Sequence, residues 1–261
     1  MIGFWIPLAA KALTAAVLVV ASSLAAERSG PFWGALIASL PVAAAPAYVF
    51  LALQTDAVFI AQSALSSFAT NGALALFLMS VVYLAPIAPK SVTIAGAVGV
   101  WMGAAFVIHQ VPWTALSAFA MMSALFFIGM RLARAHVGLT VLPPPAARHW
   151  IDLPLRAGLV GCLVAAVVAM AGVLGPSMTG AAAVFPVVYV SLITVLLIRL
   201  GGKAVAATMA NAYPPLFGFG VALLVLHLTA EAFGLVLSLS LALATTLGWS
   251  LMLILKRRML L

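Results

Sequence analysis

The chain has 261 residues, of which 66% are hydrophobic and only 6% are charged, with 12 Lys and Arg against 4 Asp and Glu. A soluble domain of this size carries about a quarter charged residues, so the composition excludes a soluble protein and indicates an all-α integral membrane protein. The cationic excess favours basic loops that face anionic headgroups of a lipid bilayer, not nucleic-acid binding.

Apolar runs of about 18 to 25 residues recur along the chain, and each can cross a hydrocarbon layer of about 30 Å. We expect the first run to be retained as a membrane span and not cleaved as a signal peptide, because it lacks a basic start. Hydropathy predicts about nine transmembrane helices, near residues 4–26, 31–53, 57–88, 91–110, 112–133, 153–174, 177–198, 202–230 and 232–255.

The basic residues between these predicted spans all fall on one side of the membrane. With the C-terminal Lys256 in the cytoplasm, counting spans backwards places on the same side Arg28, Lys90, the 131–156 linker, Arg199 and Lys203. This asymmetry follows the positive-inside rule. It predicts a multi-pass protein of the cell inner membrane, with the N-terminus outside and the C-terminus in the cytoplasm.

The segment 5–42 is repeated 145 positions later as residues 150–187, without a gap. Trp5 aligns with Trp150, and about a third of the stretch is identical. An odd number of predicted spans separates the two copies, so the second copy is inverted in the membrane. We therefore predict two inverted four-helix repeats, residues 1–110 and 153–261, which are joined by one extra span and a cytoplasmic loop at 111–152.

Each repeat has a first span, a polar break, a Gly-containing helix start and then a Pro. These elements are Gly30-Pro31, Gly34 and Pro41 in one copy, and Gly175-Pro176, Gly180 and Pro186 in the other. In these features each half resembles the small four-span membrane proteins of the GlpM type. The resemblance implies a fused, inverted duplication of such a unit, and it assigns no catalytic or binding residue.

The segments 57–88 and 202–230 are longer than a bilayer needs, so each must tilt or break. The segments Ala69-Thr70-Asn71-Gly72 and Tyr213-Pro214-Pro215 overlap when the two copies are aligned at the 145-residue offset, and Gly and Pro both interrupt helices. We therefore predict breaks near Asn71 and Tyr213. Each break would follow a short helix, at 57–68 and 202–212.

Polar side chains accompany both predicted breaks, and broken helices with hydroxyl and amide groups are typical of transporter substrate sites. The candidate substrate-binding residues are Ser63, Ser66, Asn71, Thr208, Asn211 and Tyr213. We predict that Ser66, Asn71, Asn211 and Tyr213 line one cavity near the bilayer centre. In the alternative interpretation the short helices lie flat on the membrane surface, and their polar residues only cap the spans that follow.

Lys11 and Arg156 are equivalent cations near the start of spans one and six, and they are further candidate substrate-binding residues. A cation inside the membrane normally faces a partner or a water-filled cavity, which indicates an anionic substrate. The alternative is that both side chains extend to the lipid headgroups.

These patterns predict a secondary transporter or a flippase for a small organic or phosphorylated anion, which works by alternating access between inverted repeats. The alternative is a non-transporting scaffold or accessory subunit of an envelope-assembly complex. The sequence leaves open whether the protein forms a homo-oligomer. The carboxylates fall at span ends and Cys162 stands alone, so we expect no enzyme, no metal site and no cofactor. His227 is the best titratable candidate, but a lone interfacial His is more often an inert hydrogen-bonding residue, and the same holds for His109.

Overall fold

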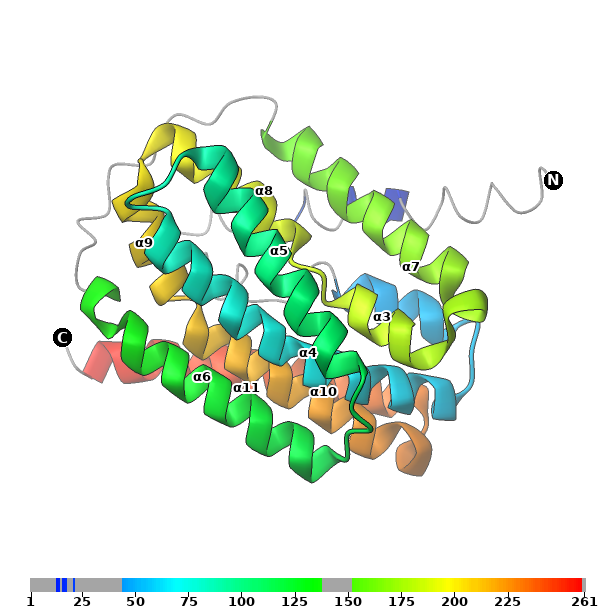
Figure 1. The fold of residues 1–261 in the computed structure, drawn as a ribbon. Coiled ribbons are helices and arrows are strands. Elements are labelled where there is room, and N and C mark those ends of the chain that lie inside the picture. The colour runs from blue at the N-terminus through cyan, green and yellow to red at the C-terminus, as the bar shows by residue number, and fades with distance from the viewer. Residues whose placement is uncertain (1–12, 15, 18–20, 22–43, 138–151, 260–261) are drawn as a thin grey trace.

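The computed structural model of the protein describes residues 13–14, 16–17, 21, 44–137 and 152–259. This part of the chain forms helices and no strand, so the predicted all-α class is confirmed (Figure 1). The main helices are α3 (Ala44–Ala52), α4 (Ala57–Leu84), α5 (Lys90–His109), α6 (Ala115–Val137), α7 (Asp152–Ala183), α8 (Val187–Arg199), α9 (Gly202–Ala210), α10 (Tyr213–Phe233) and α11 (Leu235–Met259).

Six helical segments of the described part are long and apolar enough to cross a membrane, so the chain is a multi-pass membrane protein. Five of them match predicted spans and correspond to α4, α5, α6, α10 and α11. The sixth runs over 157–198 and covers two predicted spans. Because most residues of the predicted spans 4–26 and 31–53 lie outside the described residues, the count of nine stays a prediction.

Helix α4 is the central element of the bundle. It contacts α3, α5, α6, α7, α9 and α10. In its most apolar stretch 72% of the residues are buried, against 17% for α11 at the periphery. Large apolar side chains on α5, α6 and α11 are exposed instead, which suits a surface that faces lipid.

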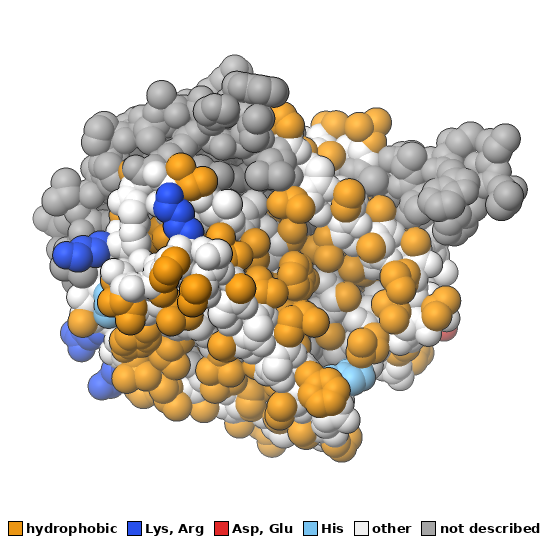
Figure 2. Space-filling view, turned by 45° about the horizontal axis from the view of Figure 1, so that its top comes forward, with side chains coloured by type: hydrophobic (Ala, Val, Ile, Leu, Met, Phe, Trp, Pro, Cys, Tyr) orange, Lys and Arg blue, Asp and Glu red, His pale blue; other side chains and the backbone are white. Residues whose placement is uncertain are grey.

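The charged side chains divide between the two ends of the bundle (Figure 2). We call one end, at the left of both figures, the basic end; its described cations are Lys90, Arg131, Arg134, Lys203 and Lys256. The other, the acidic end, holds Asp56, His109 and Glu231. Asp56 caps α4 by accepting a hydrogen bond from the backbone N–H of Phe59 at 2.8 Å.

The predicted break near Asn71 is wrong, because α4 continues without interruption from Ala57 to Leu84. A single glycine costs a helix only about 1 kcal/mol, and packing readily offsets this amount. The missing side chain of Gly72 is replaced by Met121 and Leu125 of α6, which pack against the helix at this point. The short separate helix predicted at 57–68 is therefore part of α4.

The predicted break near Tyr213 is confirmed. Helix α9 ends at Ala210, and α10 begins at Tyr213. Pro214 and Pro215 lack backbone N–H groups, so they cannot donate to the last turn of α9. The interruption is mild, because Asn211 and Ala212 keep right-handed helical backbone angles.

A sharper break lies within α7 at Gly175. Its φ of 70° is in the left-handed region that favours glycine, and Pro176 then starts a new helical direction. The new segment, Pro176–Ala183, ends before Pro186, which is the N-cap of α8. The span predicted at 177–198 is thus two shorter helices separated by the turn at 184–186.

The segment Pro176–Ala183 crosses α4 at very short range. A Cβ added to Gly180 would lie 2.0 Å from the carbonyl oxygen of Ser63. Only a glycine fits at this crossing, because the atom that it meets belongs to the backbone and cannot turn away. Small residues of this kind allow close helix contact inside membranes.

We predict that Gly180→Ala destabilises the protein by about 1–3 kcal/mol, the usual cost of overpacking. The measurement is the thermal unfolding midpoint of the purified protein in detergent. Gly172→Ala is the matched control, since it lies in the same helix with nothing within 4 Å of an added Cβ. Equal midpoints for the two variants would show that α7 does not cross α4 at Gly180.

Candidate functional site

Six polar residues follow one another in pairs along the first half of α4. The pairs are spaced by four residues, so they form two parallel stripes on adjacent faces of the helix. We call them the outer stripe, Gln62, Ser66 and Thr70, and the inner stripe, Ser63, Ser67 and Asn71. Thr70 and Asn71 stand at the middle of this 28-residue helix.

The outer stripe lines a pocket of about 370 Å³, which we call the polar pocket. The opposite walls come from the end of α5, from the connection to α6 and from Ser177 of α7. The complete lining is Gln62, Leu65, Ser66, Ala69, Thr70, Ile108, His109, Gln110, Val111, Pro112, Trp113 and Ser177. On α4 the lining runs from Gln62 to Thr70 at the middle of the helix, a distance of about 12 Å at 1.5 Å per residue.

Hydrogen bonds connect three walls of the polar pocket. The Ser66 hydroxyl donates to the backbone oxygen of Ser177 at 2.6 Å, and the Ser177 hydroxyl lies 3.2 Å from Nδ1 of His109. Within the described part of the chain, the side chains of Gln62, Thr70 and Gln110 have no hydrogen-bond partner. The pocket therefore offers two amides and a hydroxyl that are not committed to the fold.

The inner stripe faces the packed interior. Ser67 donates to the backbone oxygen of Gly180 at 2.5 Å, and its hydroxyl lies 2.6 Å from that of Tyr48 on α3. Ser63 is fully buried, and its hydroxyl has no partner among the described residues. These contacts join α3, α4 and the segment Pro176–Ala183 at one point.

Asn71 connects α4 to α10. Its side-chain amide donates to the backbone oxygen of Leu216 at 3.2 Å. Gly220 makes the approach possible, because a Cβ there would lie 2.6 Å from the Asn71 amide nitrogen. The Asn71 amide oxygen is buried and has no partner in the described part of the chain.

Aromatic packing closes the bundle between Asn71 and the basic end. The Tyr213 hydroxyl donates to the backbone oxygen of Ala75 at 2.9 Å, and the Tyr213 ring lies edge-on to Phe126 at 6.0 Å. Gly129 of α6 leaves room for the Tyr213 ring. Both aromatic residues are fully buried, and neither lines the polar pocket.

The other candidate residues lie apart from the polar pocket. Thr208 and Asn211 bond to backbone oxygens of their own helix, those of Ala204 and Ala207, both at 2.8 Å. The lining of the polar pocket includes Ser66 but not Asn71, Asn211 or Tyr213. Lys11 and the side chain of Arg156 lie outside the described residues.

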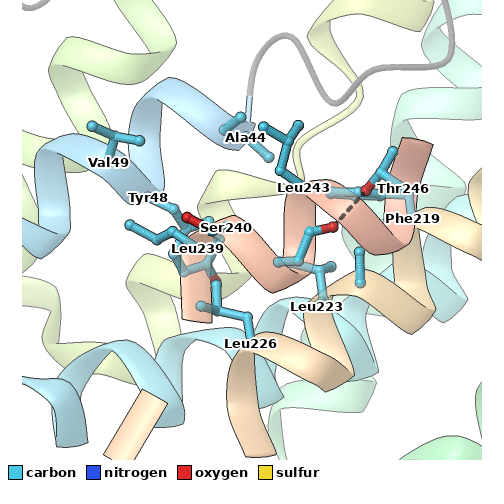
Figure 3. Close-up of a pocket in the computed structure, with 13 residues that line it drawn as sticks. Ala44, Tyr48, Val49, Phe219, Leu223, Leu226, Leu239, Ser240, Leu243 and Thr246 are labelled. Atoms are coloured by element: carbon cyan, nitrogen blue, oxygen red, sulfur yellow. Dashed lines mark hydrogen bonds between the residues drawn. The ribbon is translucent and has the colours of Figure 1, made fainter. Parts of the chain in front are cut away.

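A second cavity, of about 280 Å³, lies between α3, α10 and α11 (Figure 3). Leucine and alanine side chains dominate its walls. Its hydroxyl groups already have partners: Tyr48 pairs with Ser67, Ser240 donates to the Val236 backbone oxygen, and Thr246 donates to that of Ala242. This cavity suits a hydrocarbon group and offers nothing to a polar solute.

No protein-family model, no curated protein and no solved structure matches the chain. The chemistry of the site therefore has to follow from its own residues.

The sequence interpretation missed His109, Gln110, Trp113 and Ser177 as members of a site. The first three lie at or after the end of α5, and a loop position does not reveal which side chains it brings to another helix. The recurrence of polar pairs at every fourth residue of α4 is a signal that could have identified the pocket wall.

We predict that Asn71→Ala lowers the free energy of unfolding by about 1–2 kcal/mol, because it removes a buried hydrogen bond between α4 and α10. Asn211→Ala is the matched control, and it should cost less than about 0.5 kcal/mol since that amide is exposed and bonds within its own helix. Unfolding titrations of both variants in mixed micelles give the comparison. A larger loss for Asn211→Ala would contradict the assigned contacts.

Proposed function

We propose that the protein is a secondary transporter or a flippase, which moves a small organic or phosphorylated anion by alternating access between two inverted repeats. The observation that carries the proposal is the polar pocket. It lies near the acidic end of an apolar bundle, where His109 and Gln110 line it, and its wall on the central helix ends at Thr70, in the middle of α4. A scaffold that only packs helices together has no use for such a one-sided polar opening.

Helix boundaries support the internal repeat. Helix α4 begins at Ala57 and α9 at Gly202, and α5 begins at Lys90 and α11 at Leu235. Both pairs of starts are separated by the 145 residues of the sequence repeat. By the same offset α8 is the repeat equivalent of α3, and α11 is the equivalent of α5. A two-fold relation requires that if α3 contacts α11, then α8 contacts α5, and both contacts are present.

The direction of the helices supports the inversion. In Figure 1, α4 runs from the acidic end to the basic end, whereas its repeat equivalent, α9 with α10, runs the opposite way. Asn71 bonds to Leu216, its own equivalent 145 residues later. A residue meets its equivalent only close to the axis that relates the two copies, so the proposed pseudo-two-fold axis passes near this bond at the middle of α4.

The same relation identifies where the second opening forms. The repeat equivalents of Ser63 and Ser66 are Thr208 and Asn211. In the described conformation these two residues belong to a helix at the basic end, behind the aromatic layer. Alternating access exchanges the roles: the pocket at Ser66 closes while a pocket at Asn211 opens.

Charge supports an anionic substrate. The polar pocket has no carboxylate among its lining residues. The described cations gather at the basic end, where they attract an anion that has crossed the aromatic layer. We propose that Lys11 and Arg156, whose side chains lie outside the described residues, attract the anion as the sequence predicts, with headgroup contact as the alternative.

We predict that the basic end is cytoplasmic, since the positive-inside rule governs short loops with Lys and Arg. The test uses a reporter that is active only in the cytoplasm. It should be active when fused after the C-terminus and when inserted in the α4–α5 turn beside Lys90. A reporter in the α5–α6 connection near Pro112 is the opposite-side control. Cytoplasmic activity at all three points would refute the orientation.

We predict that a cysteine at Thr70, in a Cys162→Ala background, reacts with a membrane-impermeant thiol reagent added from the acidic end. The polar pocket admits water to this depth, although the helix centre is otherwise shielded by packing. A cysteine at Asn211 should react with the reagent added from the basic end. Its reactivity should rise in the conditions that lower the reactivity of the cysteine at Thr70. Ser123→Cys on α6, which lines neither opening, is the control.

Two results would contradict the transporter. The first is a Thr70→Cys variant that is unreactive in every condition, because no water-filled opening then exists. The second is reaction of both cysteines at fixed rates under all substrates and gradients, which is the behaviour of a rigid scaffold.

A further inference from the structure

The polar pocket combines hydrogen-bonding groups in a way that specifies a chemical class of ligand. Its polar side chains are Gln62, Ser66, Thr70, His109, Gln110 and Ser177, and none of them is a carboxylate, a lysine or an arginine. A site built for a free phosphate or carboxylate normally presents Arg, Lys or several backbone N–H groups. The pocket itself therefore recognises an uncharged group.

Amides and hydroxyls both donate and accept hydrogen bonds. The uncommitted groups of Gln62, Thr70 and Gln110 line the pocket from two sides, α4 and the connection after α5. A ligand that satisfies them must also carry donors and acceptors, closely spaced on more than one side. Hydroxyl groups on adjacent carbon atoms meet this requirement.

Trp113 adds an apolar surface to the pocket. Its indole N–H donates to the backbone oxygen of Ile108 at 2.8 Å, so the ring is fixed and its polar edge is already satisfied. The ring face is left for C–H groups of a ligand. The volume of about 370 Å³ lies in the range of about 300–1,000 Å³ that small-molecule sites occupy.

We propose that the polar pocket binds an uncharged, hydroxyl-rich unit, a monosaccharide or a cyclic or linear polyol, of the transported molecule. This inference rests on the proposed transport function and adds its substrate class. Gln62, Thr70 and Gln110 bond to the hydroxyl groups, Trp113 packs against the C–H face, and the link from Ser66 through Ser177 to His109 holds the walls together. The charged part of the substrate, a phosphate or a carboxylate, remains outside this pocket.

The test is equilibrium binding to the full-length protein in nanodiscs. The probes are D-glucose, D-mannitol, myo-inositol, glucose 6-phosphate and inorganic phosphate. The readout is protection of a Val111→Cys residue from a thiol reagent in the Cys162→Ala background, because Val111 lines the pocket and supplies no side-chain hydrogen bond. We expect saturable protection by at least one of the three neutral probes, with millimolar affinity. Inorganic phosphate should give none.

Side-chain variants test whether the neutral probes bind in the polar pocket. Thr70→Val keeps the shape of the side chain and removes its hydroxyl, and Gln62→Leu removes the amide; each should weaken binding about 5- to 10-fold, the value of one hydrogen bond. Ser80→Ala is the matched control on α4, because that hydroxyl bonds to the Phe77 backbone oxygen outside the pocket lining. It should leave binding unchanged.

Three results would overturn the substrate class: protection by inorganic phosphate alone, no saturation by any neutral probe below about 100 mM, or neutral binding that Thr70→Val and Gln62→Leu leave unchanged. The reactivities of cysteines at Thr70 and Asn211 separate this failure from that of the proposed function. If those reactivities alternate while no neutral probe binds, the transporter stands and only the substrate class is wrong.

Discussion

The crossing of the segment Pro176–Ala183 over α4 is the contact on which the rest of the arrangement depends. In hydrocarbon no water is present to satisfy polar groups, so the hydroxyls of α4 need partners from other helices. The absent side chain at Gly180 lets two backbones approach, and only then do the oxygens of Ser177 and Gly180 come within reach of Ser66 and Ser67. The same crossing brings Ser177 to the wall of the polar pocket. Close packing and the candidate site thus have one origin.

Much of the fold could be predicted from the sequence. Apolar length and composition predict membrane helices. Pro214-Pro215 marks the interruption between α9 and α10, and Gly175-Pro176 marks the one within α7. These predictions succeed because Pro lacks a donor and Gly tolerates positive φ, which are local properties. The error at Asn71 has the opposite cause. Whether Gly72 ends a helix depends on Met121 and Leu125, which pack on it from α6, and a local pattern does not contain them.

The candidate site was predictable only in part for a similar reason. Ser63 and Ser66 are recognisable because a run of polar residues is unusual in an apolar helix. Their division into a pocket-facing stripe and a buried stripe depends on where α3 and α7 lie. His109 and Gln110 carry no signal in their own neighbourhood, since the end of α5 approaches Ser177 only after the chain has folded. Tyr213 was expected in a cavity, but its hydroxyl bonds to Ala75 and closes the bundle.

The long separation between α4 and its partners has a consequence for biosynthesis. Ser66 and Ser177 are 111 residues apart, and Asn71 and Leu216 are 145 residues apart. At about 5–20 residues per second, α4 leaves the ribosome roughly 6–20 s before the oxygen of Ser177 exists. During that time Ser66, Ser67 and Asn71 of the nascent helix lack the α7 and α10 oxygens to which they later donate. The helix must wait at the membrane–water interface or beside the insertion machinery, so assembly of the bundle is controlled by the arrival of its second half.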